Sequence, residues 1–474
     1  PPVCDAGAWP AGGVRDRGQM SVFAQPFRIA VVSIAAVLAS FGAVYCLCRA
    51  LDVNATPAIL AATLAMSMSR RMQIPNLRKF TAELVLLPLI ALTAGLVGMA
   101  LLKLPPVGAM LFIGGMVLSI LLRKYGSLAR TIGRIIAIPL IAILVVPVRI
   151  EGIDGRWLPA ALMVAAGLAA LLCSAGAAWL AGRIGWAEAD TGQSTLASKA
   201  VAPAKRSLHI AERMALQMFV ALGLAFAIGM LVFPAHWAWV VLTAFIVCSG
   251  TVSRGDAVYK GLMRLGGAVG GAILAAAMAH IAVSGPAADA AIIFAILFIG
   301  IWLRQIHYTG WAVCATLIFA LLQGPQDEAI LSLLGMRIVC ILTGALCGIA
   351  AASFVYPIRT EQLVRKRVAE ALHTLRDALA AGQAPGKSAL DRHAAELDRL
   401  APSLRLHRRL VGSAKASTHP VAWVDRMQAL IAQAQTGEID RARLGAQMRE
   451  LGGMLKARAQ APAKQNRAAS NIAD

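Results

Sequence analysis

The chain is poor in charged residues. Only 15% of its 474 residues are charged, whereas 58% are hydrophobic and the mean hydropathy is +0.69. A soluble chain of this length would carry about 25% charged residues. The deficit lies in residues 27–356, and the remaining C-terminal part reads as soluble. The composition therefore predicts one large membrane domain followed by a small polar domain.

Common catalytic and metal-binding motifs are also missing from the sequence. It has neither a GxxxxGK[ST] phosphate-binding loop nor a Gly-x-Ser-x-Gly nucleophile turn. Most of the eight cysteines fall in apolar runs, where a thiol behaves as a small hydrophobe. Cys46 and Cys48 are too close in sequence for a relaxed disulfide or a zinc knuckle. We expect no enzyme activity, no cofactor, no metal site and no ATP-driven transport by this chain alone.

Apolar runs long enough for membrane spans recur between residues 27 and 356. The second run of each half and the eleventh run are short, so they could be half-helices, tilted spans or re-entrant elements. We therefore predict twelve spans, with ten as the alternative count. Their approximate bounds are 27–48, 55–69, 80–102, 104–122, 132–148, 157–181, 213–233, 236–250, 262–281, 287–303, 308–322 and 334–356.

The net charge of +21 follows the membrane topology. Lys and Arg crowd into every second loop, which places both termini in the cytoplasm by the positive-inside rule. We expect the basic residues to contact anionic lipid rather than nucleic acid, because no basic platform interleaved with aromatic residues is present. The loops placed outside carry only these basic residues: Arg49, Lys103, Arg149 and Arg156.

The two sets of six spans resemble each other. Ser69-Arg70 follows the second span as Ser253-Arg254 follows the eighth, and Leu122-Arg123 follows the fourth as Leu303-Arg304 follows the tenth. Six spans preserve orientation, so the repeats are expected to be parallel, with a site near the midplane between them. The predicted fold is an all-α polytopic membrane protein with two parallel six-helix repeats and a C-terminal cytoplasmic helical domain.

The predicted domain boundaries follow these patterns. Periodic apolar residues after residue 357 indicate a small helical bundle. The expected segments are a disordered leader at 1–26, a first repeat at 27–181, a cytoplasmic linker at 182–212, a second repeat at 213–357, a cytoplasmic helical domain at 358–458 and a disordered tail at 459–474.

The second half carries moderately specific motifs. They are His236-Trp-Ala-Trp239, the Arg-x9-Arg-x2-Gly-x3-Gly pattern of 254–271, Tyr308-Thr-Gly-Trp311, and Arg337 followed by Gly344 and Gly348. With these motifs the chain resembles the fusaric acid resistance and aromatic acid exporter superfamily of inner-membrane proteins. The resemblance implies proton-driven efflux of small aromatic carboxylic acids, often beside a periplasmic membrane-fusion adaptor. Unlike well-known full-length members, this chain has only a short linker between its halves.

Charged residues inside apolar runs are the strongest candidates for a site, because each costs about 2.5–3.5 kcal/mol to insert. Arg337 could bind an anionic substrate bidentately, or it could pair with Asp327 or Glu328 in the preceding loop. Arg264 could act as a gate for the substrate at the cytoplasmic start of the ninth span, or as an anchor for lipid headgroups.

Further candidates are polar or aromatic residues in the spans. Glu83 is an acid within an apolar run and could couple transport to protons, although it could instead pair with Arg134. Trp239, Tyr308 and Thr243 could contact the substrate. For the aromatic residues the alternative is an aromatic belt at the membrane interface.

The sequence favours secondary efflux of small organic anions across the bacterial inner membrane. Alternating access between the halves is the expected mechanism, and a homo-oligomer is compatible with the pattern. Two alternatives remain open at this point. One is a passive anion channel of the same architecture, and the other is a non-transporting scaffold of an envelope complex.

Overall fold

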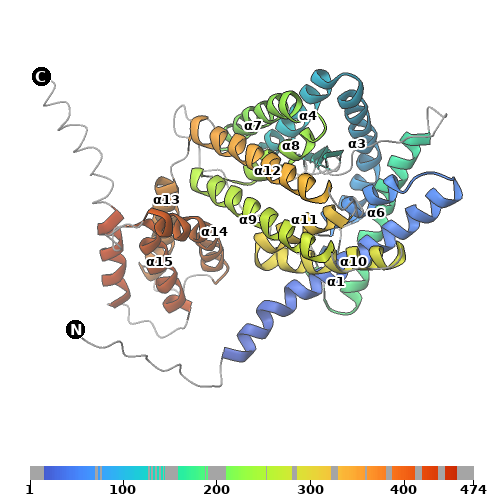
Figure 1. The fold of residues 1–474 in the computed structure, drawn as a ribbon. Helices are drawn as coiled ribbons and strands as arrows, with labels where there is room; N and C mark the ends of the chain where they lie inside the picture. Colours follow the sequence, from blue (N-terminus) through green and yellow to red (C-terminus); the bar gives the residue numbers. More distant parts are fainter. Residues whose placement is uncertain are drawn as a thin grey trace, which may run out of the picture. The chain divides into compact units, whose positions relative to one another are not determined.

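The computed structural model is almost entirely helical (Figure 1). Its described part falls into two compact units, and each is treated by itself. The first is Pro1–Phe245 with Met263–Cys347, and the second is Ile246–Leu262 with Gly348–Asp474. The described residues are 15–69, 73–74, 77–125, 129, 132–133, 136–137, 140–141, 143–144, 158–186, 188–189, 210–251, 253–279, 286–321, 329–357, 360–380, 387–411, 419–435 and 443–455.

Helices occupy eleven of the twelve predicted spans in the described part of the chain. The other predicted span, 132–148, lies largely outside the described residues. The first half contains α1 (Arg15–Ala50), α2 (Thr56–Met68), α3 (Leu77–Lys103), α4 (Pro105–Leu121) and α6 (Leu158–Arg183). The second half contains α7 (Ile210–Val232), α8 (Trp237–Cys248), α9 (Arg254–Ala279), α10 (Pro286–Ile306), α11 (Tyr308–Leu321) and α12 (Ala329–Phe354).

Six of these helices are long and apolar enough to cross a membrane, as judged from the described residues: α1, α6, α7, α9, α10 and α12. The helices α2, α4, α8 and α11 are shorter apolar helices. With 13, 12 and 14 residues, α2, α8 and α11 reach about 18–21 Å at 1.5 Å per residue, short of the 30 Å hydrocarbon core. The predicted short runs are therefore short helices, and the count of twelve spans stays a prediction.

Two helices begin earlier than the apolar runs that predict them. Helix α1 begins at Arg15, so residues 15–26 of the expected leader are helical, with Pro26 inside the helix. Helix α9 begins at Arg254, before the apolar run at 262. The Ser253 hydroxyl accepts the Asp256 N–H at 3.4 Å and so caps the start of α9. Polar residues can therefore extend a helix beyond its apolar part.

The predicted linker between the halves also contributes structure. Its Glu188–Ala189 segment (β2) pairs in parallel with Gln73–Ile74 (β1) from the first half. Residues 190–209, which make up most of the linker, lie outside the described residues.

Two reciprocal contacts join the halves within the first unit. Helix α4 packs against α7, and α10 packs against α1. Phe112 meets Phe226 edge-on at 5.5 Å between ring centroids and 70° between planes. Phe41 meets Phe294 at 5.3 Å and 72°. In both contacts, the fourth helix of one half lies against the first helix of the other.

Glycines allow close helix packing in the second half. A Cβ atom at Gly271 of α9 would lie 2.6 Å from the Thr316 Cβ of α11, and one at Gly267 would collide with Ala312. A Cβ atom at Gly344 of α12 would lie 2.9 Å from the Thr243 Cβ of α8. The two glycines of the Arg-x9-Arg-x2-Gly-x3-Gly pattern therefore let α9 pack closely against α11.

The second unit contains the predicted helical bundle, although its location in the cytoplasm is not tested. Its helices are α13 (Thr360–Ala380), α14 (Lys387–Val411), α15 (Pro420–Gln435) and a helical segment at 443–455. Trp423, Leu375 and Leu390 are fully buried in its core. The unit also includes the connection 246–262 between α8 and α9, where the Gly255 N–H donates to Thr360 Oγ1 at 3.2 Å.

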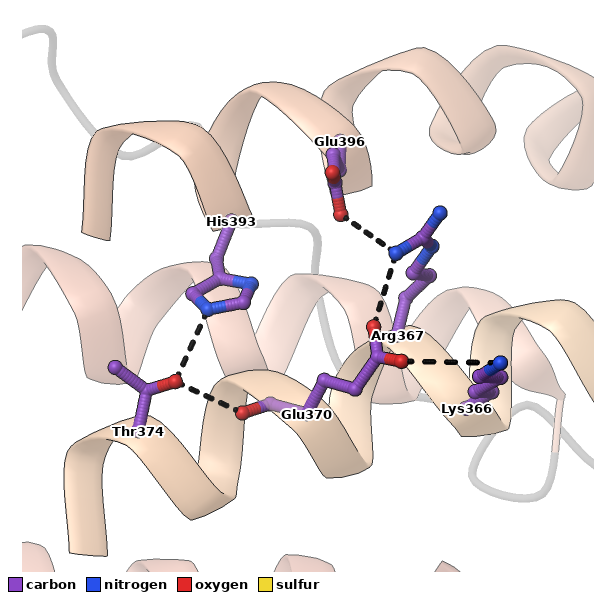
Figure 2. Close-up of polar contacts among 6 residues, drawn as sticks. All are labelled: Lys366, Arg367, Glu370, Thr374, His393 and Glu396. Carbon is purple, nitrogen blue, oxygen red and sulfur yellow. Dashed lines mark hydrogen bonds and ion pairs between the residues drawn. The ribbon is translucent and has the colours of Figure 1, made fainter. Parts of the chain in front are cut away.

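A polar network joins α13 and α14 inside this bundle (Figure 2). One guanidinium nitrogen of Arg367 contacts Glu370 at 2.9 Å and Glu396 at 3.2 Å. The Thr374 hydroxyl donates to the Glu370 carbonyl at 3.1 Å and lies 3.1 Å from His393 Nε2. In this network the charged side chains are paired with opposite charges.

Candidate functional site

Arg337 lies on α12 and is almost completely buried, with 5% of its surface exposed. Its guanidinium carbon lies 4.3 Å from the centre of the Phe319 ring of α11 and 5.2 Å from that of Trp239 of α8. Ring faces attract cations through their quadrupoles, typically by about 0.5–2 kcal/mol. Two aromatic residues thus partly stabilise the buried charge.

Arg264 lies on α9 and is 4% exposed. Its guanidinium is near the Tyr308 hydroxyl of α11, but no well-formed hydrogen bond joins the two groups. Arg264 is also close enough to Arg337 for the two positive charges to repel each other. A third cation, Arg304 of α10, lies near Tyr308 and stacks on Trp311 at 5.2 Å.

The two buried arginines have no acidic partner among the described residues. No ion pair joins either of them to a carboxylate in this part of the chain, and their Nε atoms lack hydrogen-bond partners, as does the Tyr308 hydroxyl. Asp327 and Glu328, the alternative partners for Arg337, lie outside the described residues. Unpaired buried charges in a membrane protein are costly and are a common mark of a substrate or ion site.

The close packing of the helices determines where these side chains lie. Gly267 and Gly271 bring α9 against α11, so that Arg264 reaches the start of α11. Gly344 brings α12 against α8, so that the Arg337 guanidinium reaches the Trp239 ring. The sequence places the two arginines far apart, and helix packing brings their charges together.

Trp239 lies between two other groups. The His236 ring stacks on it at 4.5 Å with 7° between planes, while the Arg337 guanidinium approaches from α12. The nearby Trp237 instead stacks on Phe226 of α7 at 5.6 Å. Aromatic side chains near the ends of these helices therefore contact protein partners in addition to any role at the membrane interface.

The structure brings four of the predicted site residues together: Arg264, Arg337, Trp239 and Tyr308. Thr243 lies on the same helix as Trp239, and its hydroxyl donates to the Trp239 carbonyl at 2.9 Å. The Glu83 side chain lies outside the described residues, so its predicted role is untested.

Phe319 was missed by the sequence analysis. It follows Tyr308 by about three helical turns, so the 3.6-residue period places both on one face of α11. That spacing could have linked Phe319 to the predicted site. The proximity of Arg337 to this face could not have been read from the sequence.

The described residues include six helices long and apolar enough to cross a membrane, which define the class as a multi-pass membrane protein. The comparisons then give its relatives. A family model described as fusaric acid resistance protein-like matches residues 219–351, which confirms the family resemblance over this part of the chain. The match runs from α7 into α12 and includes every residue of the arginine site. No curated protein and no solved structure shows significant similarity to the chain.

Proposed function

We propose that this chain exports small organic anions, and specifically aromatic carboxylic acids, across the bacterial inner membrane. The observation that carries the proposal is the pair of buried arginines, Arg264 and Arg337, without a described acidic partner. Such a pair supplies positive charge and hydrogen-bond donors in an apolar setting, which is what a carboxylate needs to leave water.

Aromatic residues at the site support the choice of an aromatic substrate. A carboxylate could bind the guanidinium groups, while its ring stacks on Trp239 or Phe319, which already flank Arg337. Tyr308 offers a buried hydroxyl beside Arg264 for a polar substituent of the substrate. We assign charge recognition to the arginines and ring recognition to the aromatic side chains.

Reciprocal packing of the halves supports two parallel repeats and alternating access. The pairs Phe112–Phe226 and Phe41–Phe294 have nearly equal geometry. In the first helices of the two halves, Phe226 follows Phe41 by the same number of residues, to within one, as the second Ser-Arg motif follows the first. In the fourth helices, Phe294 follows Phe112 as the second Leu-Arg motif follows the first, again to within one residue. A parallel repeat places equivalent helices around an axis along the membrane normal, where rocking of one half against the other exposes a site to either side.

Proton coupling belongs to the same proposal. Glu83 of α3 would carry the proton, with both termini in the cytoplasm. A periplasmic adaptor could accept the exported acid. These features rest on the sequence pattern and on the family resemblance.

The test is growth of a host in fusaric acid or 4-hydroxybenzoic acid, with and without the gene. We expect the wild type to confer resistance, and Arg337→Gln and Arg264→Gln to abolish it. Arg183→Gln is the matched control, because Arg183 also lies over an aromatic ring, that of Trp179 at 4.8 Å, but is exposed. If both buried arginines can be replaced with resistance intact, the anion site is wrong.

Transport of labelled aromatic acids in proteoliposomes separates the remaining possibilities. An exporter coupled to protons requires an imposed pH gradient, whereas a passive channel carries the acid down its own gradient without one. A scaffold carries none, and its function would be lost when residues 361–474 are deleted.

A further inference from the structure

We infer that the Arg264–Arg337 site binds a small inorganic anion of the chloride class whenever no carboxylate occupies it, so that export proceeds as an exchange of anions. The binding of the inorganic anion stands on the geometry alone. The exchange rests on the proposed export of carboxylates. The charge of the site, its hydrogen-bond donors and the space around it each favour this ligand.

The charge of the site is not balanced by the described residues. Two guanidinium groups, each about 95% buried, repel one another. A buried charge is costly to insert into a membrane, and a cation–π contact returns only part of that cost. Trp239 and Phe319 flank Arg337, so among the described residues part of the positive charge is left for a bound anion to balance.

The hydrogen-bond donors of the site point to the same ligand. Three buried atoms lack a partner: Arg264 Nε, Arg337 Nε and Tyr308 Oη. All three can donate a hydrogen bond, and a buried donor without an acceptor destabilises the protein. A single anion near the arginines would accept from several of these groups at once.

The size of the ligand follows from the packing around the site. A Cβ atom at Gly344 would lie 2.9 Å from Thr243, and one at Gly271 would lie 2.6 Å from Thr316. Helix α12 is therefore in close contact with α8, and α9 is in close contact with α11, in this conformation. A ring-bearing carboxylate requires these helices to separate, whereas an ion of one atom does not.

The consequence for transport is an exchange. An empty site would have to return across the membrane with two uncompensated charges, and this step is costly for the same reason that the charges are costly to bury. A site loaded with chloride returns with a single net positive charge, as it does when a carboxylate is bound. One carboxylate therefore leaves the cytoplasm as one inorganic anion enters, and charge is balanced.

The first experiment measures binding by thermal unfolding of the full-length protein in detergent, in sodium chloride or sodium gluconate at equal ionic strength. We expect chloride to raise the midpoint saturably, by about 3 °C, in the wild type and in the control Arg183→Gln. Arg264→Gln and Arg337→Gln should lose this shift. Tyr308→Phe, which keeps both charges, should weaken chloride binding by about threefold to tenfold.

The second experiment measures export from proteoliposomes loaded with labelled benzoate under an imposed pH gradient, with chloride or gluconate outside. We expect external chloride to speed benzoate efflux by about tenfold, a factor that corresponds to 1.4 kcal/mol on the return step. Arg183→Gln should keep this acceleration.

The outcomes separate this inference from the proposed function. If chloride gives no specific stabilisation, the inorganic-anion site is overturned, and benzoate binding still decides the exporter. If chloride binds but efflux is equally fast in gluconate, the exchange is overturned. If chloride binds and benzoate is neither bound nor exported, the proposed function fails while the anion site stands.

Discussion

The two halves of the membrane region treat buried polar groups differently. In the described part of the first half, the buried polar residues are serines whose hydroxyls donate to backbone carbonyls. Ser40 donates to the Val37 carbonyl at 3.0 Å, and Ser33 of α1 reaches the Ser69 carbonyl after α2 at 3.2 Å. Such hydroxyls are satisfied by helices that already lie nearby, so they need no ligand.

The second half contains buried charges instead. Arg264 and Arg337 are the charged residues among the buried polar groups of the described chain, and their Nε atoms have no partner. The halves share helix order and reciprocal contacts, yet among the residues that the structure describes only the second half leaves buried charged groups with unsatisfied polar atoms. The difference indicates that one half can serve as a packing scaffold while the other carries the site. Buried polar groups that lack partners are expected mostly at functional sites.

The largest expected effect comes from removing one of these charges. Arg337→Gln should lower affinity for an aromatic carboxylate by about 30-fold or more, because a buried charged partner is worth about 2 kcal/mol or more. The thermal midpoint should stay level or rise, since an unpaired and repelled charge is removed. Substrate-dependent and substrate-free thermal unfolding in detergent measure both quantities.

The matched control for this variant is Ser40→Ala in the first half. Its transport should be unaffected, and its stability should fall slightly because a satisfied hydrogen bond is lost, by about 1 kcal/mol. A loss of stability in Arg337→Gln as large as that of a core mutant would mean that Arg337 is structural, and the contrast between the halves would then disappear.

A second prediction tests the glycine contacts that position the arginines. Gly267→Ala places a methyl group against Ala312 of α11 and should destabilise the protein by about 1–3 kcal/mol. Gly266→Ala, one position earlier on the same helix, meets nothing within 4 Å and should be neutral or stabilising by about 0.5–1 kcal/mol. Equal effects of the two changes on the unfolding midpoint would contradict the packing of α9 on α11.

A third prediction tests the likeness of the halves. Double-mutant cycles with leucine replacements at Phe112–Phe226 and at Phe41–Phe294 should give similar coupling energies, of about 0.5–1.5 kcal/mol each. Thermal or detergent unfolding gives the four free energies of each cycle. A coupling in one pair and none in the other would argue against equivalent helix contacts in the two halves.

The smallest predicted effect lies in the bundle of the second unit. His419 Nδ1 accepts the Val421 N–H at 3.2 Å at the start of α15, so its proton is on Nε2, which lies 3.3 Å from His407 Nδ1. Burial lowers the pKa of His419 below its usual 6.5, and the charges of His407 and Arg408 lower it further, whereas Glu361 opposes them.

The sign of the pH effect follows from this lowered pKa. Above pH 6.5 the folded bundle keeps the full contribution of His419 to its stability. This contribution decreases as the pH falls from 6.5 towards the lower folded-state pKa, because the unfolded chain takes up the proton first. After correction for intrinsic rates, hydrogen exchange of the backbone amides at the first turn of α15 should speed up as the pH is lowered from 7.5 to 5.5. His419→Asn keeps a capping group and should reduce this dependence.

The control for the pH effect is His373→Asn. His373 is exposed and pairs with Asp377 at 2.7 Å on the surface of α13. Its replacement should leave the exchange of α15 and its pH dependence as in the wild type. If His419→Asn behaves in the same way as this control, the buried histidine pair does not govern the start of α15.

Much of the helix layout could be predicted from the sequence. The apolar runs predict α2, α4, α8, α10 and α11 to within a few residues, because a span must be apolar along its whole length. The early starts of α1 and α9 could not be predicted in the same way, since polar residues extend these helices without adding hydropathy. The inclusion of 246–262 in the second unit likewise depends on long-range packing.

The site was predicted in its residue types but not in its arrangement. Arg264 and Arg337 stand out because charges are rare in apolar runs. The guanidinium of Arg337 lies against Phe319 because α11 and α12 approach each other, and no local pattern encodes that approach. The roles of Glu83 and Thr243 in transport stay predictions.

By itself the sequence determined that this protein is helical, that it lies in a membrane and that its polar bundle follows the spans. These properties depend on the local balance of apolar and charged residues. Only the tertiary structure decided that the charges of two buried arginines on different helices interact, with Tyr308 near Arg264 and with Trp239 and Phe319 against Arg337. Close approach at glycine faces brings them together, and it depends on the shapes of helices that are distant in the chain.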